Sequence, residues 1–281
     1  MPSHLRAPRL VATDLDGTLL RSDGTVSPRT RAALLAAERA GIEVVFVTAR
    51  PPRWLHDVRD VVGRHGVAIC ANGAAVVDVR ADVVLAERAM DRGVVSTLVA
   101  RVRDRLPGTR FAVERRAGIL AEQGFVGPHP LPVGAPVVDR LEAALDDATY
   151  KLLARRPGGD PGAFLRDVAA VLGPDAVLAD SGAVGLAEVT GPGVTKASTL
   201  ATWAEQRGLG PDDVWAFGDA PNDLPMLAWA GVSFAVGNAH PDVAGAADRR
   251  CATNDDDGVA EQLEGALGLL DEGRGQAASA R

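Results

Sequence analysis

The chain has 281 residues, and its 47% hydrophobic and 24% charged residues are an ordinary globular composition for one large domain or two smaller ones. The net charge of −7 argues against a general nucleic-acid surface, and two cysteines make neither a disulfide framework nor a zinc pattern. No apolar run approaches the ~20 residues that cross a bilayer, and the N-terminal segment does not resemble a signal peptide. We therefore expect a soluble, cytoplasmic protein without nucleic-acid or membrane partners.

The first third of the chain alternates predicted strands with predicted helices. The clearest helix is "SPRTRAALLAAERAG", in which Ser27 can cap the first turn, Pro28 suits the first helical position and Gly41 suits the exit. In chain order we predict a strand at 10–13, this helix at 27–41, a strand at 42–50, a helix at 53–63 and a strand at 67–70. This alternation predicts a parallel sheet with helices on its faces.

Residues 90–188 have a different pattern, with shorter strands and a Pro/Gly-rich loop, "GFVGPHPLPVGAP". We predict helices near 92–105, 137–146 and 161–173, and strands near 110–114, 119–122, 149–156, 176–179 and 184–189. Paired strands with helices on one face predict an α+β module inserted into the α/β domain.

The last third returns to the alternation of strand and helix. We predict helices at 195–208 and 222–231, strands at 213–219 and 232–238, and a strand, a loop and a closing helix across 249–267. The fold class is therefore α/β, with a Rossmann-like, doubly wound, mainly parallel sheet formed by residues 1–89 and 189–270. The small, polar tail at 271–281 is predicted to be disordered.

Polar residues follow the predicted strands of this sheet. Asp14 and Asp16 end the first strand, and residues two apart in an extended segment point to the same side, so the two carboxylates need a cation or a shared proton. Ligands of open α/β sheets bind at the carboxyl ends of the strands. The further candidates there are Thr48, Ala49, Arg50, Asn72, Gly73, Gly218, Asp219, Asn222 and Asp223, with Lys196 at the start of a helix.

This set of side chains suits phosphate chemistry. Mg²⁺ takes oxygen ligands and is usually held by carboxylates, phosphate and water, and a metal would relieve the repulsion between Asp14 and Asp219. Lysine and free backbone N–H groups bind phosphate oxygens. One aspartate can attack phosphorus, and a second can protonate the leaving group and later deprotonate water.

The segments "DLDGTLL", "VFVTAR", "VTKAS" and "GDAPNDLPM" resemble the four motifs of the haloacid dehalogenase (HAD) superfamily, in that order. "ANGA" and "NDDDGVAE" are similar to further segments of its Cof-like phosphatase branch, whose cap, of the C2B type (subclass IIB), is inserted between the second and third motifs. The resemblance covers nearly the whole chain. Two departures, Ala197 after the lysine and Pro221 in the fourth motif, remove no chemical group.

The resemblance implies a role for each matching residue. Asp14 would be the nucleophile and a Mg²⁺ ligand, and Asp16 the general acid/base, with its backbone carbonyl also facing the metal. Asp219 would ligate Mg²⁺ directly, and Asp223 would complete the metal shell or orient its waters. The residues expected to hold the phosphoryl group or the substrate are Thr48, Ala49, Arg50, Asn72, Gly73, Lys196 and Asn222.

Several of these residues have a structural alternative. Asp223 lies where a helix begins and can be a helix cap as well as a metal ligand. Asn72 and Gly73 form a turn dipeptide that can face the substrate or only turn the chain. Arg50 can position the substrate or pair with a carboxylate. Candidate pocket residues in the insert are Arg115, Arg116, Phe125, His129 and Lys151.

Taken together, these features predict a Mg²⁺-dependent phosphatase that forms an aspartyl-phosphate and acts on small phosphorylated metabolites such as sugar phosphates. The presence of Asp16 favours hydrolysis, since relatives without an acid there hydrolyse poorly. The alternatives are a phosphomutase of the same fold and a catalytically silent binding module. We expect a monomer or a weak homodimer.

Overall fold

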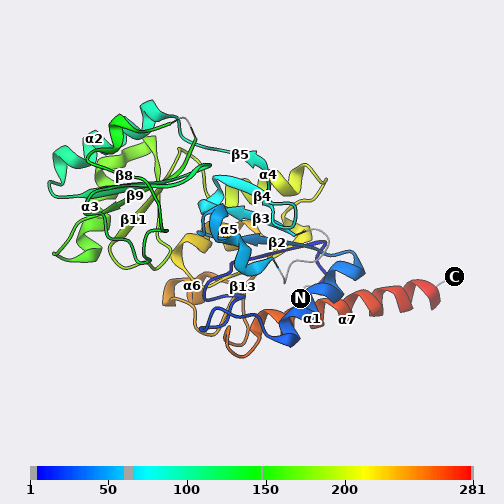
Figure 1. Cartoon of the computed structure of the whole chain (residues 1–281). Helices are drawn as coiled ribbons and strands as arrows, with labels where there is room; N and C mark the ends of the chain where they lie inside the picture. The colour runs from blue at the N-terminus through cyan, green and yellow to red at the C-terminus, as the bar shows by residue number, and fades with distance from the viewer. Residues whose placement is uncertain (1–4, 60–65, 147, 280–281) are drawn as a thin grey trace.

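The computed structural model describes residues 5–59, 66–146 and 148–279. The chain forms two lobes, each built on its own sheet (Figure 1). The core is formed by the two ends of the chain, and the middle of the chain forms the inserted cap, drawn in green. Within these ranges, no helix is both long enough and apolar enough to span a bilayer.

The core sheet has eight strands among the described residues, in the order β14-β13-β12-β1-β2-β3-β4-β5. Neighbours from β14 to β3 are parallel, and β4 and β5 are added antiparallel. The strands are β1 (Leu10–Thr13), β2 (Glu43–Val47), β3 (Val67–Cys70), β4 (Ala75–Asp78), β5 (Val83–Glu87), β12 (Val214–Gly218), β13 (Val232–Ala235) and β14 (Arg249–Arg250). The predicted α/β class with a mainly parallel sheet is confirmed.

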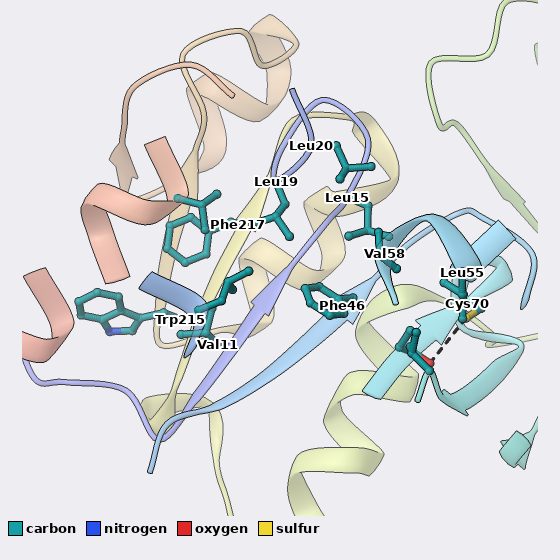
Figure 2. Packing of buried hydrophobic residues seen from close by; sticks show 14 of the residues in the cluster. Val11, Leu15, Leu19, Leu20, Phe46, Leu55, Val58, Cys70, Trp215 and Phe217 are labelled. Atoms are coloured by element: carbon teal, nitrogen blue, oxygen red, sulfur yellow. Dashed lines mark hydrogen bonds between the residues drawn. The ribbon is translucent and has the colours of Figure 1, made fainter. Parts of the chain in front are cut away.

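Helices cover both faces of the core sheet. One face packs against α1 (Pro28–Ala40) and α7 (Gly258–Ser279), and the other against α4 (Lys196–Glu205), α5 (Leu224–Trp229) and α6 (Pro241–Ala246). Successive strand residues point to opposite faces, so Val11 joins the first cluster while Leu10 and Ala12 join the second. Figure 2 shows Val11 beside Trp215 and Phe217 in the first cluster. Burial on both faces explains why these strands are apolar throughout.

The ends of α1 follow the local signals in the sequence. The side chain of Ser27 accepts a hydrogen bond from the backbone N–H of Thr30 at 2.9 Å, and Pro28 occupies the first helical position. Gly41 ends the helix with a left-handed φ of 93°, which costs a glycine little. The predicted bounds of this helix are confirmed.

The cap sheet has six strands in the described part of the chain, in the order β10-β11-β9-β6-β7-β8. They are β6 (Arg110–Arg115), β7 (Gly118–Glu122), β8 (Val137–Val138), β9 (Thr149–Arg155), β10 (Val177–Ala179) and β11 (Leu186–Thr190). Helices α2 (Arg92–Arg105) and α3 (Pro161–Leu172) bury one face of this sheet. The opposite face carries a smaller apolar cluster that includes Phe125, Leu153 and Leu186.

The structure differs from the sequence prediction in three connecting segments. The helix expected at 137–146 is instead the short strand β8 and a single 3₁₀ turn at Leu141–Ala143, because Val137 and Val138 pair with β7. The helix expected from residue 53 is a 3₁₀ helix at Pro52–Val58, and the rest of that prediction falls on residues 60–65, outside the described ranges. Strands β4 and β5 were not predicted.

The fourth difference lies at the C-terminal end. Helix α7 continues through Ser279, whereas composition predicted a disordered tail at 271–281. The first half of α7 packs its apolar residues into the core. This packing offsets the unfavourable free energy of forming the first helical turns. The Glu, Arg, Gln and Ala residues that follow are good helix formers and extend it.

Candidate active site

The centre of the site is a buried lysine between two carboxylates. Lys196 is the first residue of α4, which Thr195 caps by accepting a hydrogen bond from the backbone N–H of Ser198. The Lys196 ammonium donates to Oδ1 of Asp14 at 2.7 Å and to Oδ1 of Asp223 at 2.6 Å. Asp14 follows β1, and Asp223 follows β12, its neighbour in the sheet. The parallel neighbours β1 and β12 therefore bring Asp14 and Asp223 to the same lysine.

Asp223 makes no side-chain cap hydrogen bond to α5, and its carboxylate instead organises the turn before that helix. Its Oδ2 accepts hydrogen bonds from the backbone N–H groups of Asp219 and Ala220, each at 3.1 Å, and this fixes the turn after β12. Its Oδ1 accepts from Lys196. A Cβ on Gly218 would lie 2.6 Å from the Cβ of Asp223, so only glycine lets the strand end pass this close.

Asp219 lies beside the turn that follows Asp16. The hydroxyl of Thr18 donates to Oδ1 of Asp219 at 2.6 Å. Gly17 has a φ of 80°, and a Cβ there would lie 2.4 Å from Oδ2 of Asp219. Glycine at position 17 is therefore required both by backbone conformation and by the close approach of this carboxylate.

The three carboxylates carry more negative charge than Lys196 alone balances, and burial shifts the pKa values of two of them. Burial raises the pKa of Asp14 well above its usual range, and Lys196 offsets this only in part. Burial also raises the pKa of Asp219 to about 6. Burial opposes the charge on Lys196, but Asp14 and Asp223 outweigh it and raise the lysine pKa.

The donor set fits a hard divalent cation. Carboxylate oxygens of Asp14, Asp219 and Asp223 lie within 4.8 Å of one another, and Asp14 and Asp223 are buried. Mg²⁺ prefers oxygen ligands and is commonly held by a small number of carboxylates. A cation at this point would favour the charged forms of Asp14 and Asp219, which burial disfavours.

The side chain of Asp16 lies apart from this cluster, at the mouth of the site. Its carboxylate accepts two hydrogen bonds from the guanidinium of Arg50, at 2.8 and 2.7 Å, and its side chain is 58% exposed. Arg50 therefore pairs with a carboxylate in this structure, which is one of the two alternatives left open for it. More than half of the Asp16 side chain meets solvent even though Arg50 holds both of its oxygens.

The loop after β2 is held from several sides. The hydroxyl of Thr48 is fully buried and accepts from the backbone N–H of Arg50 at 3.0 Å. The backbone carbonyl of Thr48 accepts from the N–H of Asn72 at 3.1 Å, and Asn72 has a left-handed φ of 58°. The carbonyl of Ala49 accepts from the ammonium of Lys151 in the cap at 2.9 Å.

Gly73 has a packing role in the structure. Its φ is 105°, and a Cβ there would lie 2.3 Å from the backbone oxygen of Thr195. The hydroxyl of Thr199 donates to the Gly73 carbonyl at 2.7 Å. The turn that contains Gly73 thus presses against the start of α4, and Gly73 does not line the cavity described next.

A cavity of about 370 Å³ lies between the core and the cap. The predicted site residues that line it are Asp14, Asp16, Ala49, Arg50, Lys196 and Asn222. Its cap side is largely apolar, with Ile119, Phe125, Leu153 and Leu186 on the open face of the cap sheet.

Three of the five candidate pocket residues in the insert line this cavity: Phe125, His129 and Lys151. The other two do not. Arg115 pairs with Asp146 at 2.8 Å, and Arg116 pairs with Glu87.

Among the cavity-lining residues that sequence reasoning missed are Arg53, Trp54, Glu114 and Glu188. Arg53 in the core binds Glu114 in the cap through two hydrogen bonds, at 3.0 and 2.7 Å. Trp54 meets the ring of His129 edge-on, with ring centroids 4.8 Å apart. The signal that could have found the two glutamates is an acidic residue that follows apolar residues within a strand, in "FAVER" and "LAEVT".

The fold and the site define a class of capped α/β hydrolases that place aspartates at the carboxyl edge of a parallel sheet. A model of the haloacid dehalogenase-like hydrolase family matches residues 11–263, so the chain belongs to this family. The resemblance inferred from the four motifs is thereby confirmed.

Two relatives with assigned activities are similar over most of the chain. Pyridoxal phosphate phosphatase YbhA of Escherichia coli is 28% identical over 265 residues, covering 90% of this chain and 96% of its own. The 5-amino-6-(5-phospho-D-ribitylamino)uracil phosphatase YcsE of Bacillus subtilis is 27% identical over 257 residues, covering 91% and 94%. With the family match, these relatives make the chain a phosphatase-type HAD enzyme.

Solved structures agree with this assignment. A haloacid dehalogenase-like hydrolase from B. subtilis superposes with a TM-score of 0.78 at 25% identity, covering 91% of this chain and 99% of that one. The HAD subclass IIB sugar phosphatase BT4131 superposes with a TM-score of 0.73 at 22% identity, covering 92% and 99%. At that identity, the second likeness shows the fold alone.

Proposed function

We propose that the protein is a Mg²⁺-dependent phosphomonoester hydrolase that acts on small phosphorylated metabolites through an aspartyl-phosphate on Asp14. The observation that carries the proposal is the buried contact of Asp14 with Lys196 beside a cavity of about 370 Å³ between the core and the cap. That volume lies within the usual range for small-ligand sites.

In the first half-reaction, an oxygen of Asp14 attacks phosphorus, and the bond from phosphorus to the leaving-group oxygen breaks. Asp16 gives a proton to that oxygen, so the leaving group departs as an alcohol. Lys196 lies 2.7 Å from Asp14 and places its positive charge where the phosphoryl oxygens gather negative charge. Thr48 begins the loop whose next residues, Ala49 and Arg50, line the same cavity.

In the second half-reaction, water attacks the phosphorus of the aspartyl-phosphate, and Asp16 takes the proton from that water. The bond between phosphorus and Asp14 breaks, which restores the carboxylate and releases inorganic phosphate. The exposed position of Asp16 suits both steps, because its carboxylate can reach first the leaving group and then water.

Asp14, Asp219 and Asp223 are the residues that would hold Mg²⁺. The bound ion would supply positive charge to the phosphoryl group during transfer. Asp223 contacts both Lys196 and the backbone N–H of Asp219, so it holds these two residues in place around the proposed metal site.

The test of this proposal is phosphate release from a panel of phosphomonoesters, with and without Mg²⁺. The panel contains pyridoxal phosphate, 5-amino-6-(5-phospho-D-ribitylamino)uracil and several sugar phosphates, the first two chosen because similar proteins are named for them. Release that depends on Mg²⁺ supports the proposal. An isomeric product without phosphate release would indicate a mutase instead, and no turnover of any ester would indicate a binding module.

Metal binding is expected to depend on pH through Asp219. Its folded pKa of about 6 lies above the ordinary value of 3.8, so the metal-free fold holds a proton there that the unfolded chain has lost. This group's contribution to stability is therefore present below pH 4 and is lost as pH rises through about 6. Mg²⁺ must displace that proton, so it binds more weakly below pH 6.

The measurement is the rise in melting temperature on adding Mg²⁺, compared at pH 5 and pH 7.5. We expect a clearly larger rise at pH 7.5 in the wild type, and little rise at either pH in Asp219→Asn. Equal rises at the two pH values would contradict the assignment of Asp219 as a metal ligand.

A further inference from the structure

Lysine is almost absent from this chain. Lysine fills two of the 30 Lys and Arg positions, and arginine fills the other 28. Both lysines, Lys151 and Lys196, are buried and line the same cavity. Lys196 belongs to the proposed catalytic centre. Lys151 has no part in the proposed reaction, so the presence of a second buried ammonium in the cavity needs an explanation of its own.

Lys151 forms a buried ion pair inside the cap and a contact across to the core. It lies on β9, and its ammonium donates to Oε1 of Glu188 on the neighbouring strand β11 at 2.9 Å. The two side chains are 4% and 7% exposed. The same ammonium donates to the backbone carbonyl of Ala49 in the core, also at 2.9 Å. A compact ammonium with separate donors makes both contacts, whereas the planar guanidinium of arginine is larger and directs its donors differently.

Glu188, the partner of Lys151, also contacts the core. Its Oε2 accepts from the side-chain amide of Asn72 at 2.8 Å, and the amide oxygen of Asn72 accepts from Asn222 at 3.0 Å. A carboxylate only accepts hydrogen bonds, so Glu188 fixes which end of the Asn72 amide faces it and, through Asn72, the amide of Asn222.

These contacts close a ring around the loop at residues 48–50. The carbonyl of Thr48 accepts from the backbone N–H of Asn72, and the carbonyl of Arg50 accepts from the N–H of Ala71, both within the core. The carbonyl between them, that of Ala49, accepts from the cap through Lys151. The cap pair therefore holds the loop directly at Ala49 and, through Asn72, at Thr48.

We propose that the Lys151–Glu188 pair is a positioning device by which the closed cap fixes the phosphate-binding loop at 48–50. The proposal rests on the proposed function, which assigns phosphate binding to this loop. Phosphate contacts in such sites depend on geometry, and a misplacement of about 1 Å can cost 100-fold in rate. Both residues act through the loop and through Asn72, so they are positioning residues and not catalytic ones.

The experiment measures the dissociation constant of inorganic phosphate at saturating Mg²⁺ by calorimetry, and kcat/KM on the fastest panel substrate. The variants are Glu188→Gln, Lys151→Arg and the double variant Lys151→Met/Glu188→Gln. The double variant removes both charges and so leaves no unpaired buried charge. The matched control is Glu122→Gln, another buried glutamate of the cap, which pairs with Arg103 away from the cavity.

We expect all three variants to weaken phosphate binding by about tenfold or more and to lower kcat/KM by about 10- to 100-fold. Glu122→Gln should change neither value, although it lowers the melting temperature of the cap. Wild-type phosphate binding in the double variant, or an equal loss of binding in Glu122→Gln, would overturn the proposal. Phosphate binding is measured without turnover, so weakened binding in a protein that hydrolyses no ester would contradict the proposed hydrolase function alone.

Discussion

Replacing Asp14 with asparagine is expected to lower phosphate release by at least about 1,000-fold, because the amide cannot attack phosphorus. The folded protein should not be destabilised. Burial raises the pKa of Asp14, which means that the fold disfavours its charge, and a neutral amide of the same shape removes that cost. The amide oxygen can still accept the hydrogen bond from Lys196.

This prediction is checked by measuring phosphate release and the melting temperature of Asp14→Asn beside the wild type. Loss of activity together with an equal or higher melting temperature of the metal-free protein is the expected pair of results. Activity close to that of the wild type would remove Asp14 as the nucleophile. Loss of both activity and fold would show that the carboxylate has a structural role that its contacts do not predict.

Replacing Lys196 with methionine is expected to affect both catalysis and stability. Methionine fills similar space, but Asp14 and Asp223 then lose their shared buried counter-charge. Breaking a buried ion pair in this way typically costs about 3–5 kcal/mol, and the activity should fall by about 100-fold or more because the phosphoryl group loses the ammonium.

The measurement is urea unfolding of the metal-free protein, repeated with Mg²⁺. Because a bound cation can balance the same carboxylates, Mg²⁺ should restore part of the lost stability in Lys196→Met but should not restore activity. The control is Arg29→Met, which removes an exposed pairing with Glu264 and should change the unfolding free energy by no more than about 1 kcal/mol. An unfolding midpoint of Lys196→Met equal to that of the wild type would contradict the role given to this lysine.

The amino-acid sequence was sufficient for the fold class and for most of the residues at the sheet edge. Apolar strands alternate with capped helices, and this pattern alone predicts a parallel sheet. Once the sheet is parallel, the residues that follow its strands must meet at one edge, which is where Asp14 and Asp219 lie. The four ordered motifs allowed the family to be inferred, because each motif places a particular chemical group at a particular strand end or helix start.

Local sequence was a weaker guide where neighbouring segments decide the conformation. Residues 137–146 read as a helix, but Val137 and Val138 pair with β7 instead, and two valines can satisfy either pattern. The tail reads as disordered, but its residues 271–279 continue a helix whose first half packs into the core. In each of these segments the deciding contact comes from another part of the chain.

Only the tertiary structure decided which charges pair across the cavity. The sequence left open whether Arg50 faces the substrate or a carboxylate. Strand β2, which precedes Arg50, lies beside β1, which precedes Asp16, and this pairing places Asp16 against Arg50. Glu188 lies 116 residues from Asn72 in sequence, and their contact exists because the cap closes on the core. The sequence identifies which side chains stand at the end of each strand. Which of them pair between the core and the cap depends on how these two domains pack together.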